Sequence, residues 1–153
     1  MLVLLASLAL ANPFTASLVD STGATTTLAA AADGQRVVVV VMKAADCPVC
    51  VDQLSRLQRD RARLRRLGTV VVGLSAQPST SADILSDPDH DLLSELGMWR
   101  DGRAMPSLFV YDRCREERGR IVGRTPGRSP DDAVWSLLET IASDPETCGR
   151  THS

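Results

Sequence analysis

The sequence predicts an α/β fold in which helices sandwich a central mixed β-sheet. Two apolar runs, Val37–Met42 and Val70–Leu74, are rich in valine and are typical of strands buried on both faces. An amphipathic helical pattern at Pro48–Leu67 separates them, and a strong helix start follows at Ser129–Pro130. Alternation of such strands and helices indicates a layered α/β domain.

Length and composition indicate one ordinary globular domain. The chain has 153 residues, of which 44% are hydrophobic and 24% charged. Its 17 basic and 19 acidic residues give a net charge of −2, which argues against a general polyanion binder. Its few aromatic residues do not cluster into a stacking platform for single-stranded nucleic acid. We therefore expect no nucleic-acid partner, and no motif suggests a cofactor.

The N-terminal segment has the character of a secretory leader. Met1–Ala11 is apolar except for Ser7, is too short to span a bilayer, and ends in the small-x-small pattern Ala9-Leu10-Ala11. The first basic residue, however, is Arg36. We interpret residues 1–11 as a truncated signal peptide, which predicts a periplasmic or secreted protein with no membrane span in the mature chain. A buried N-terminal strand is the alternative and predicts a cytoplasmic protein.

The first part of the domain is predicted to contain one further strand. Phe14–Asp20 alternates in polarity and meets the turn Ser21–Gly23, while Leu28–Ala32 is too rich in alanine for a state to be assigned. Between the two apolar runs and the C-terminal elements, Ile84–Leu96 is predicted to form a short helix around Asp91–Leu96.

The last part of the domain is predicted to be a β-hairpin followed by a helix. Leu108–Tyr111 and Ile121–Gly123 form the hairpin, and the helix that begins at Ser129 runs to about Ala142. The domain therefore covers residues 12–142, and residues 143–153 form a C-terminal tail.

A Cys-x-x-Cys motif stands where a buried strand ends and a helix begins. Cys47 lies at the predicted helix start, where unpaired N–H groups and the helix dipole favour a thiolate. Pro48 suits the first helical turn because it lacks an N–H, and Cys50 lies on the same helix face as Cys47. We predict that Cys47 and Cys50 form a redox-active pair.

Three other interpretations of this motif stay open. Cys47 and Cys50 could bind structural zinc, carry copper, or form an inert disulfide. The remaining candidate ligands, Cys114, Cys148 and two histidines, show no paired ligand spacing. The prediction is therefore that the chain holds no metal.

These segments resemble the thioredoxin superfamily, and within it the redoxin branch of TlpA-like reductases and AhpC/TSA peroxiredoxin-like proteins. The resemblance rests on Val37–Leu67 with its Cys-x-x-Cys motif, on Phe14–Gly23, on Leu85–Asp89, and on Met105–Val110, which is similar to the family's cis-proline motif. It implies a thioredoxin-like fold over residues 13–142. It also implies a cis Pro106, with the Met105 backbone available to a substrate strand beside Cys47.

The sequence departs from the peroxiredoxin pattern at the reactive cysteine. A peroxiredoxin is expected to have Thr or Ser three residues before that cysteine and Pro seven before it, where this chain has Ala44 and Val40. The expected arginine is also missing, because neither Arg100 nor Arg103 stands in its place. These departures favour disulfide exchange over peroxide reduction.

The resemblance therefore predicts a monomeric thiol–disulfide oxidoreductase. Cys47 would attack a disulfide-containing protein or a thiol substrate, Cys50 would resolve the mixed disulfide, and an unidentified electron donor would restore the thiols. Two alternatives are a peroxiredoxin-like peroxidase, with Cys47 peroxidatic and Cys50 resolving, and a non-enzymatic binding module.

Two further features complete the prediction. In the fold that the chain resembles, the hairpin turn and the exit of the last helix lie at the same end of the sheet, so Cys114 and Cys148 are expected to form a structural disulfide there. Six arginines between positions 56 and 66 have only Asp60 among them as a counter-charge, and we interpret them as a solvated helix face.

Overall fold

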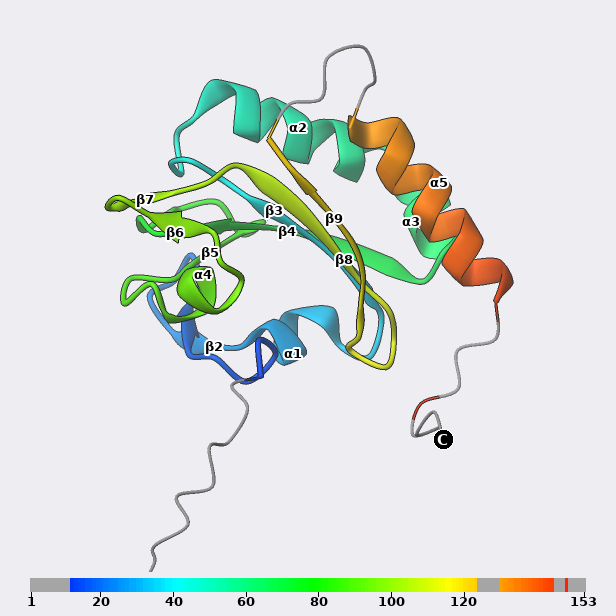
Figure 1. Ribbon diagram of the computed structural model, residues 1–153, viewed down its shortest axis with the longest axis horizontal. Helices are drawn as coiled ribbons and strands as arrows, with labels where there is room; N and C mark the ends of the chain where they lie inside the picture. Colours follow the sequence, from blue (N-terminus) through cyan, green and yellow to red (C-terminus); the bar gives the residue numbers. More distant parts are fainter. Residues whose placement is uncertain (1–11, 124–129, 145–147, 149–153) are drawn as a thin grey trace, which may run out of the picture.

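A seven-stranded mixed sheet with helices on both faces forms the body of the protein in the computed structural model (Figure 1). The structure describes residues 12–123, 130–144 and 148. The strands are β1 (Leu18–Val19), β2 (Thr25–Thr26), β3 (Arg36–Val41), β4 (Thr69–Ser75), β5 (Ile84–Ser86), β6 (Trp99–Arg100), β7 (Arg103–Ala104), β8 (Ser107–Tyr111) and β9 (Glu117–Val122). The helices are α1 (Leu28–Ala32), α2 (Pro48–Arg59), α3 (Arg61–Arg66), α4 (Asp91–Glu95) and α5 (Pro130–Ser143).

The strand order places β3 near the middle of the sheet. The order is β2-β1-β5-β4-β3-β8-β9, and β6 and β7 form a separate small hairpin. β3 pairs with β4 in parallel and with β8 in antiparallel, so both edges of β3 are hydrogen-bonded. The expected mixed sheet is therefore confirmed, as is the C-terminal hairpin of β8 and β9 followed by α5.

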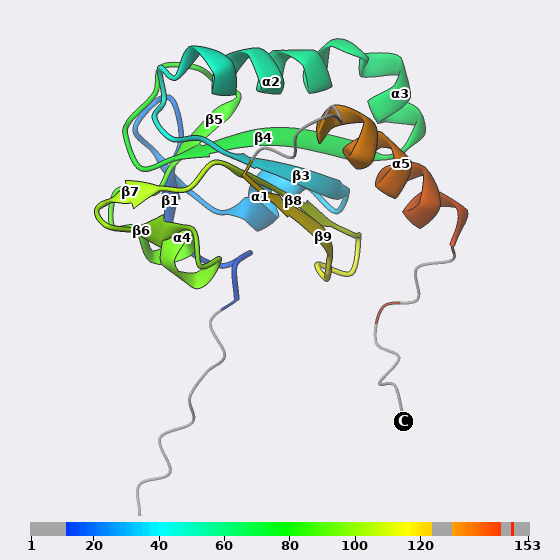
Figure 2. The same cartoon turned by 45° about the horizontal axis from the view of Figure 1, so that its top comes forward.

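Each side of β3 packs against a separate hydrophobic cluster. Val37, Val39 and Val41 pack with residues of α1 and α4, whereas Val38 and Val40 pack with residues of α2, α3 and α5. No side chain from Val37 to Val41 is more than 2% exposed. The views in Figures 1 and 2 show the same division, with α2, α3 and α5 on one face of the sheet and α1 and α4 on the other.

Three sequence predictions differ from the structure. The single helix predicted over Pro48–Leu67 is two helices, because Asp60 leaves the helical conformation and its carboxylate caps α3 by accepting from the N–H of Arg63 at 3.1 Å. The start of the helix predicted over Ile84–Leu96 is instead β5, which pairs with β4. The predicted strand at Phe14–Asp20 shortens to β1.

Gly73 allows α2 and β5 to lie close to β4. A Cβ atom at this position would lie 2.9 Å from Met42 Sδ, 3.1 Å from Ile84 Cγ1 and 3.2 Å from Leu54 Cδ2. Because such separations are too short for carbon atoms, any larger residue would push neighbouring side chains away. The absence of a side chain at Gly73 therefore helps to set the position of the helix that begins at Cys47.

A disulfide joins the β8–β9 turn to the segment that follows α5. Cys114 and Cys148 are bonded, with their Cα atoms 5.1 Å apart, inside the range that a disulfide can span. Buried Asp112 orders the turn, since its Oδ1 accepts from the N–H groups of Cys114 and Glu116 and its Oδ2 accepts from Arg118. The turn therefore holds Cys114 in place through local hydrogen bonds.

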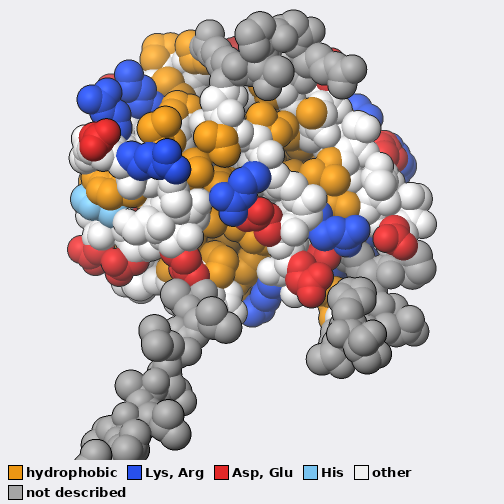
Figure 3. All heavy atoms as spheres, viewed as in Figure 1, with side chains coloured by type: hydrophobic (Ala, Val, Ile, Leu, Met, Phe, Trp, Pro, Cys, Tyr) orange, Lys and Arg blue, Asp and Glu red, His pale blue; other side chains and the backbone are white. Residues whose placement is uncertain are grey.

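The surface seen in Figure 3 carries interspersed basic and acidic side chains, with no single-sign patch across this face. Within the part of the chain that the structure describes, no helix is long and apolar enough to cross a membrane. The leader predicted at residues 1–11 and the helix cap predicted at Ser129 lie outside the described residues.

We expect the Cys114–Cys148 disulfide to be a major stabilising element. It closes a segment of 34 residues, and the chain-entropy estimate for such a loop is about 3–4 kcal/mol. The double variant Cys114→Ala/Cys148→Ala should lose free energy of unfolding of this order in urea titrations. The double variant Cys47→Ala/Cys50→Ala is the matched comparison, because its disulfide closes only three residues and should cost less. An equal or larger loss in this second variant would contradict the estimate.

A buried carboxyl group at Asp87 makes stability depend on pH. The side chain is fully buried between β5 and α4. Its Oδ2 accepts from the N–H of Leu93 at 2.8 Å, but its Oδ1 has no partner among the described residues. Burial raises the pKa of Asp87, while the bond from Leu93 lowers it in part. The folded protein therefore binds this proton more readily than the unfolded chain does.

The sign of the resulting pH dependence follows from linkage. The protonated Asp87 side chain contributes stability that is fully present at a pH below the pKa of Asp87 in the unfolded chain, about 3.9. This stability is lost as the pH rises through the higher pKa of Asp87 in the folded protein. The variant Asp87→Asn should therefore gain free energy of unfolding relative to the wild type as the pH rises from about 4 to about 7. Urea titrations across this range measure the gain. Asp89→Asn, which removes a nearby exposed carboxylate, is the control. The assignment would be refuted if the difference in free energy of unfolding between Asp87→Asn and the wild type did not change with pH.

Candidate functional site: the Cys47–Cys50 disulfide

Cys47 is the N-cap of α2 and follows the end of β3 after a short turn. Its backbone is extended, its carbonyl accepts the first helical hydrogen bond from the N–H of Val51 at 2.9 Å, and Pro48 occupies the first helical turn. The Sγ atom of Cys47 accepts from the N–H of Cys50 at 3.4 Å. The predicted strand, Cys-x-x-Cys and helix arrangement is therefore present, and the two cysteines are disulfide-bonded.

The two cysteines differ in their access to solvent. Cys50 lies on the buried stripe of α2 with Leu54 and Leu57 and is 7% exposed. Cys47 is only partly buried and contacts the edge of the same cluster. A substrate can therefore approach Cys47, whereas Cys50 is placed to react with Cys47 from inside the fold.

Exposed apolar side chains lie in the same turn as the disulfide. Val49 is 56% exposed, and Pro48 beside it is exposed as well. Val49 is not among the site residues predicted from the sequence. The helical pattern of the sequence could have predicted that Val49 is exposed, because its position lies off the buried stripe formed by Cys50, Leu54 and Leu57.

The loop that leads into α2 offers no hydroxyl group three residues before the first cysteine. The carbonyl of Ala44 accepts from the N–H of Cys47 at 3.2 Å, so Ala44 contributes a backbone acceptor and its methyl group donates nothing. Lys43 and Asp46 are exposed on either side of this turn. The departure from the peroxiredoxin pattern at position 44 therefore falls in the turn that carries Cys47.

Met105 and Pro106 lie at the same end of the sheet as Cys47. Ser107, which follows them, pairs with Val41 at the end of β3. The side chain of Met105 does not point to the disulfide, however, because Met105 packs against the cluster on the α1 and α4 face while Cys47 packs on the α2 face. The sheet therefore separates the side chain of Met105 from that of Cys47.

The expected cis bond at Pro106 is wrong, and both backbone groups of Met105 have partners within the chain. The Met105–Pro106 peptide is trans, the isomer that an X–Pro bond prefers intrinsically by about 0.5–1 kcal/mol. The N–H of Met105 donates to the carbonyl of Met98 at 2.7 Å, and its carbonyl accepts from the hydroxyl of Ser107 at 3.1 Å. Both backbone groups of Met105 are thus used within the chain.

Two arginines near Met105 and possible metal ligands are the other candidates from the sequence. Arg100 and Arg103 are opposite each other in the exposed β6–β7 hairpin. Among the described residues, no group of three or more His, Cys, Asp or Glu side chains could hold a metal ion. The site itself offers two sulfur atoms, one accessible and one buried, which can exchange two electrons as a dithiol and a disulfide.

Comparison with known proteins gives one family match and a consistent fold. The model of the AhpC/TSA family matches residues 9–116. No curated protein matches the chain in sequence.

Several peroxiredoxins of known structure have a similar fold. Peroxiredoxin Q of Xanthomonas campestris is 20% identical, with a TM-score of 0.71 over 85% of this chain and 93% of that one. Peroxidoxin BcpB of Mycobacterium tuberculosis is 20% identical, with a TM-score of 0.69 over 86% and 94%. AhpC of Enterococcus faecalis is 16% identical, with a TM-score of 0.66 over 86% and 92%. At this level of identity the likeness establishes the thioredoxin-like fold, as expected.

The difference in exposure predicts an order of chemical reactivity. After mild reduction at neutral pH, Cys47 should react with iodoacetamide at least about tenfold faster than Cys50. Cys47 is more accessible, and its position at the helix start favours its thiolate. Mass spectrometry of proteolytic peptides at successive times measures the two rates separately. Equal rates, or faster labelling of Cys50, would contradict the assignment of Cys47 as the attacking sulfur.

Proposed function

The chain belongs to the AhpC/TSA family of thiol-based redox proteins, and on that premise we propose that it is a thiol–disulfide oxidoreductase acting through Cys47 and Cys50. The observation that carries the proposal is the placement of the disulfide, with Cys47 accessible at a helix start and Cys50 buried behind it. An inert structural disulfide gains nothing from such a difference in exposure. A pair that forms and resolves a mixed disulfide requires one accessible and one protected sulfur.

The proposed reaction proceeds in two exchange steps. The Cys47 thiolate attacks one sulfur of the substrate disulfide, the substrate S–S bond breaks, and its other sulfur leaves as a thiolate. Cys50 then gives up its proton and attacks Sγ of Cys47. The bond between Cys47 and the substrate breaks, and the second substrate thiolate is released. The substrate has gained two electrons, and an external dithiol must reduce the Cys47–Cys50 disulfide for another cycle.

Surroundings of the site support a protein substrate. The exposed apolar side chains of Pro48 and Val49 stand beside the accessible sulfur and would contact a polypeptide near its disulfide. The second disulfide, between Cys114 and Cys148, supports action in an oxidising compartment such as the periplasm, where such bonds persist.

Peroxide reduction is the second candidate, because the family match and the peroxiredoxin structures with the same fold favour it. Two features of this chain weigh against it. Ala44 has no hydroxyl to polarise a peroxide, and the nearest arginines along the chain to the Met105–Ser107 segment, Arg100 and Arg103, lie in the exposed β6–β7 hairpin. Disulfide exchange requires neither group, and we therefore place it first.

Cysteine variants test the proposed exchange. In an insulin-reduction assay with dithiothreitol as electron donor, Cys47→Ser should lower the catalysed rate at least about a hundredfold, because it removes the nucleophile. Cys50→Ser, reduced and then freed of dithiothreitol before it is mixed with insulin, should accumulate a mixed disulfide between Cys47 and insulin, visible on a non-reducing gel. Cys114→Ser/Cys148→Ser is the control and should keep its activity when assayed well below its melting temperature.

A parallel assay of hydrogen peroxide and alkyl hydroperoxide consumption separates the two candidates. Rapid peroxide turnover that depends on Cys47, without insulin reduction, would replace exchange by peroxidase activity. Full activity of Cys47→Ser in both assays would remove Cys47 from either mechanism.

A further inference from the structure

The six arginines of α2 and α3 differ in whether an acidic side chain pairs with them. Three of them pair with acids on the side of α5: Arg56 with Asp52 and Asp131, and Arg63 and Arg66 with Glu139. By contrast, Arg59 of α2 and Arg61 and Arg65 of α3 have no acidic partner among the described residues.

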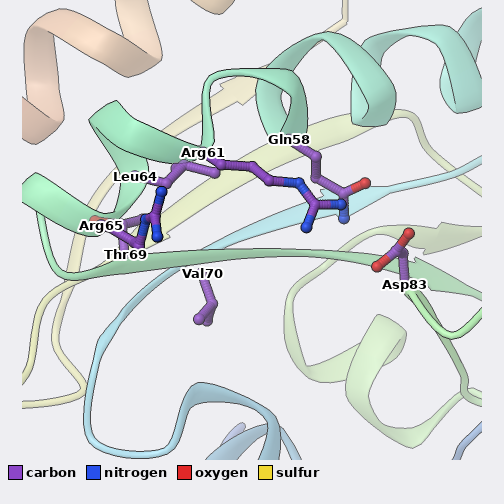
Figure 4. Close-up of a pocket in the computed structure, with 7 residues that line it drawn as sticks. All are labelled: Gln58, Arg61, Leu64, Arg65, Thr69, Val70 and Asp83. Carbon is purple, nitrogen blue, oxygen red and sulfur yellow. The ribbon is translucent and has the colours of Figure 1, made fainter.

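Two of these unpaired residues, Arg61 and Arg65, line an open groove of about 430 Å³ between α3 and β4, which we call the arginine groove. Leu64 gives it an apolar wall, and Gln58, Thr69 and Asp83 complete its polar lining. Val70 borders the groove from β4, with its side chain turned towards the other face of the sheet (Figure 4). Two of these polar groups already donate elsewhere: Gln58 Nε2 to the carbonyl of Val71 at 3.1 Å, and the Thr69 hydroxyl to the carbonyl of Leu67 at 3.0 Å. The guanidinium groups are therefore the principal donors that a ligand would meet.

Charges in the arginine groove follow one another in a defined order. Figure 4 shows Arg65 and Thr69 at one end, Arg61 extended along the middle towards Gln58, and Asp83 at the other end. The two guanidinium groups do not converge on one point, so a single small anion would meet only one of them. An extended ligand with two separate anionic groups fits both.

From this pattern we propose that the arginine groove binds an extended acidic segment of a partner protein, with carboxylates at Arg65 and Arg61 and a basic side chain at Asp83. Carboxylates match the forked donors of guanidinium groups. The acid at Asp83 disfavours a ligand whose negative charge is continuous, such as a nucleic acid or an anionic membrane. None of the residues that line the groove is aromatic, so bases would find no stacking surface.

The arginine groove is separate from the redox site and does not depend on the proposed function. Gln58 lies eleven residues after Cys47, which corresponds to roughly 16 Å along α2. Exposed charge pairs contribute modestly to affinity, so the groove is suited to a transient partner.

Binding of labelled peptides to the full chain tests the proposal. The probe is a short fluorescent peptide with two glutamates followed by a lysine, and its affinity is measured by fluorescence anisotropy at low salt. Arg61→Gln/Arg65→Gln should weaken binding roughly five- to tenfold, the effect expected for two exposed charge pairs. Arg63→Gln/Arg66→Gln is the matched control, because it removes the same charge from the same helix at positions that pair with Glu139. It should leave the affinity unchanged.

A charge reversal tests the order of charges. Asp83→Lys should weaken binding of the original peptide and strengthen binding of a peptide in which glutamate replaces the lysine. Insulin reduction should be the same in the Arg61→Gln/Arg65→Gln variant as in the wild type. The peptide assay therefore tests the arginine groove, and the insulin assay tests the redox site independently.

Three outcomes would overturn the proposal. One is an equal loss of affinity in the two double-arginine variants. Another is equally tight binding of a peptide with all charges reversed. The third is tighter binding of single-stranded DNA or of phosphatidylserine vesicles than of the acidic peptide, with the same dependence on Arg61 and Arg65.

Discussion

Burial of β3 on both faces is the constraint on which the rest of the structure depends. The valines from Val37 to Val41 can leave water only if one layer covers each face, and α1 with α4 and α2 with α5 supply these layers. Because β3 lies between β4 and β8, its backbone groups are also fully paired. The end of this strand is therefore held firmly, and Cys47 follows it after a short turn.

The amphipathic pattern of α2 turns this placement into a chemical difference between two cysteines. Cys50 belongs to the stripe that packs on the sheet, whereas Cys47 precedes the first turn and stays partly accessible. Gly73 strengthens the arrangement by letting Leu54 lie close to β4. The same packing that stabilises the fold thus sets one sulfur towards solvent and the other towards the core.

Local patterns in the sequence were sufficient for the parts of the protein that depend on neighbours along the chain. The run Val37–Met42 predicts β3, the order of Cys47 and Pro48 predicts a helix start, and the acidic first turn after Pro130 predicts α5. Each of these signals acts within a few residues. They were therefore enough to identify the layered α/β class and the strand, Cys-x-x-Cys and helix site.

Tertiary structure decided the features that need contacts between distant segments. Ile84–Ser86 is a strand because β4 offers a free edge beside Gly73, and three residues carry too weak a pattern to show this alone. The N–H of Met105 is occupied because the chain folds back to Met98. Which arginines of α2 and α3 find acids depends on where α5 lies. In every case the deciding energy comes from packing and hydrogen bonds across the fold, whereas the sequence determined by itself only what short-range periodicity and helix capping can specify.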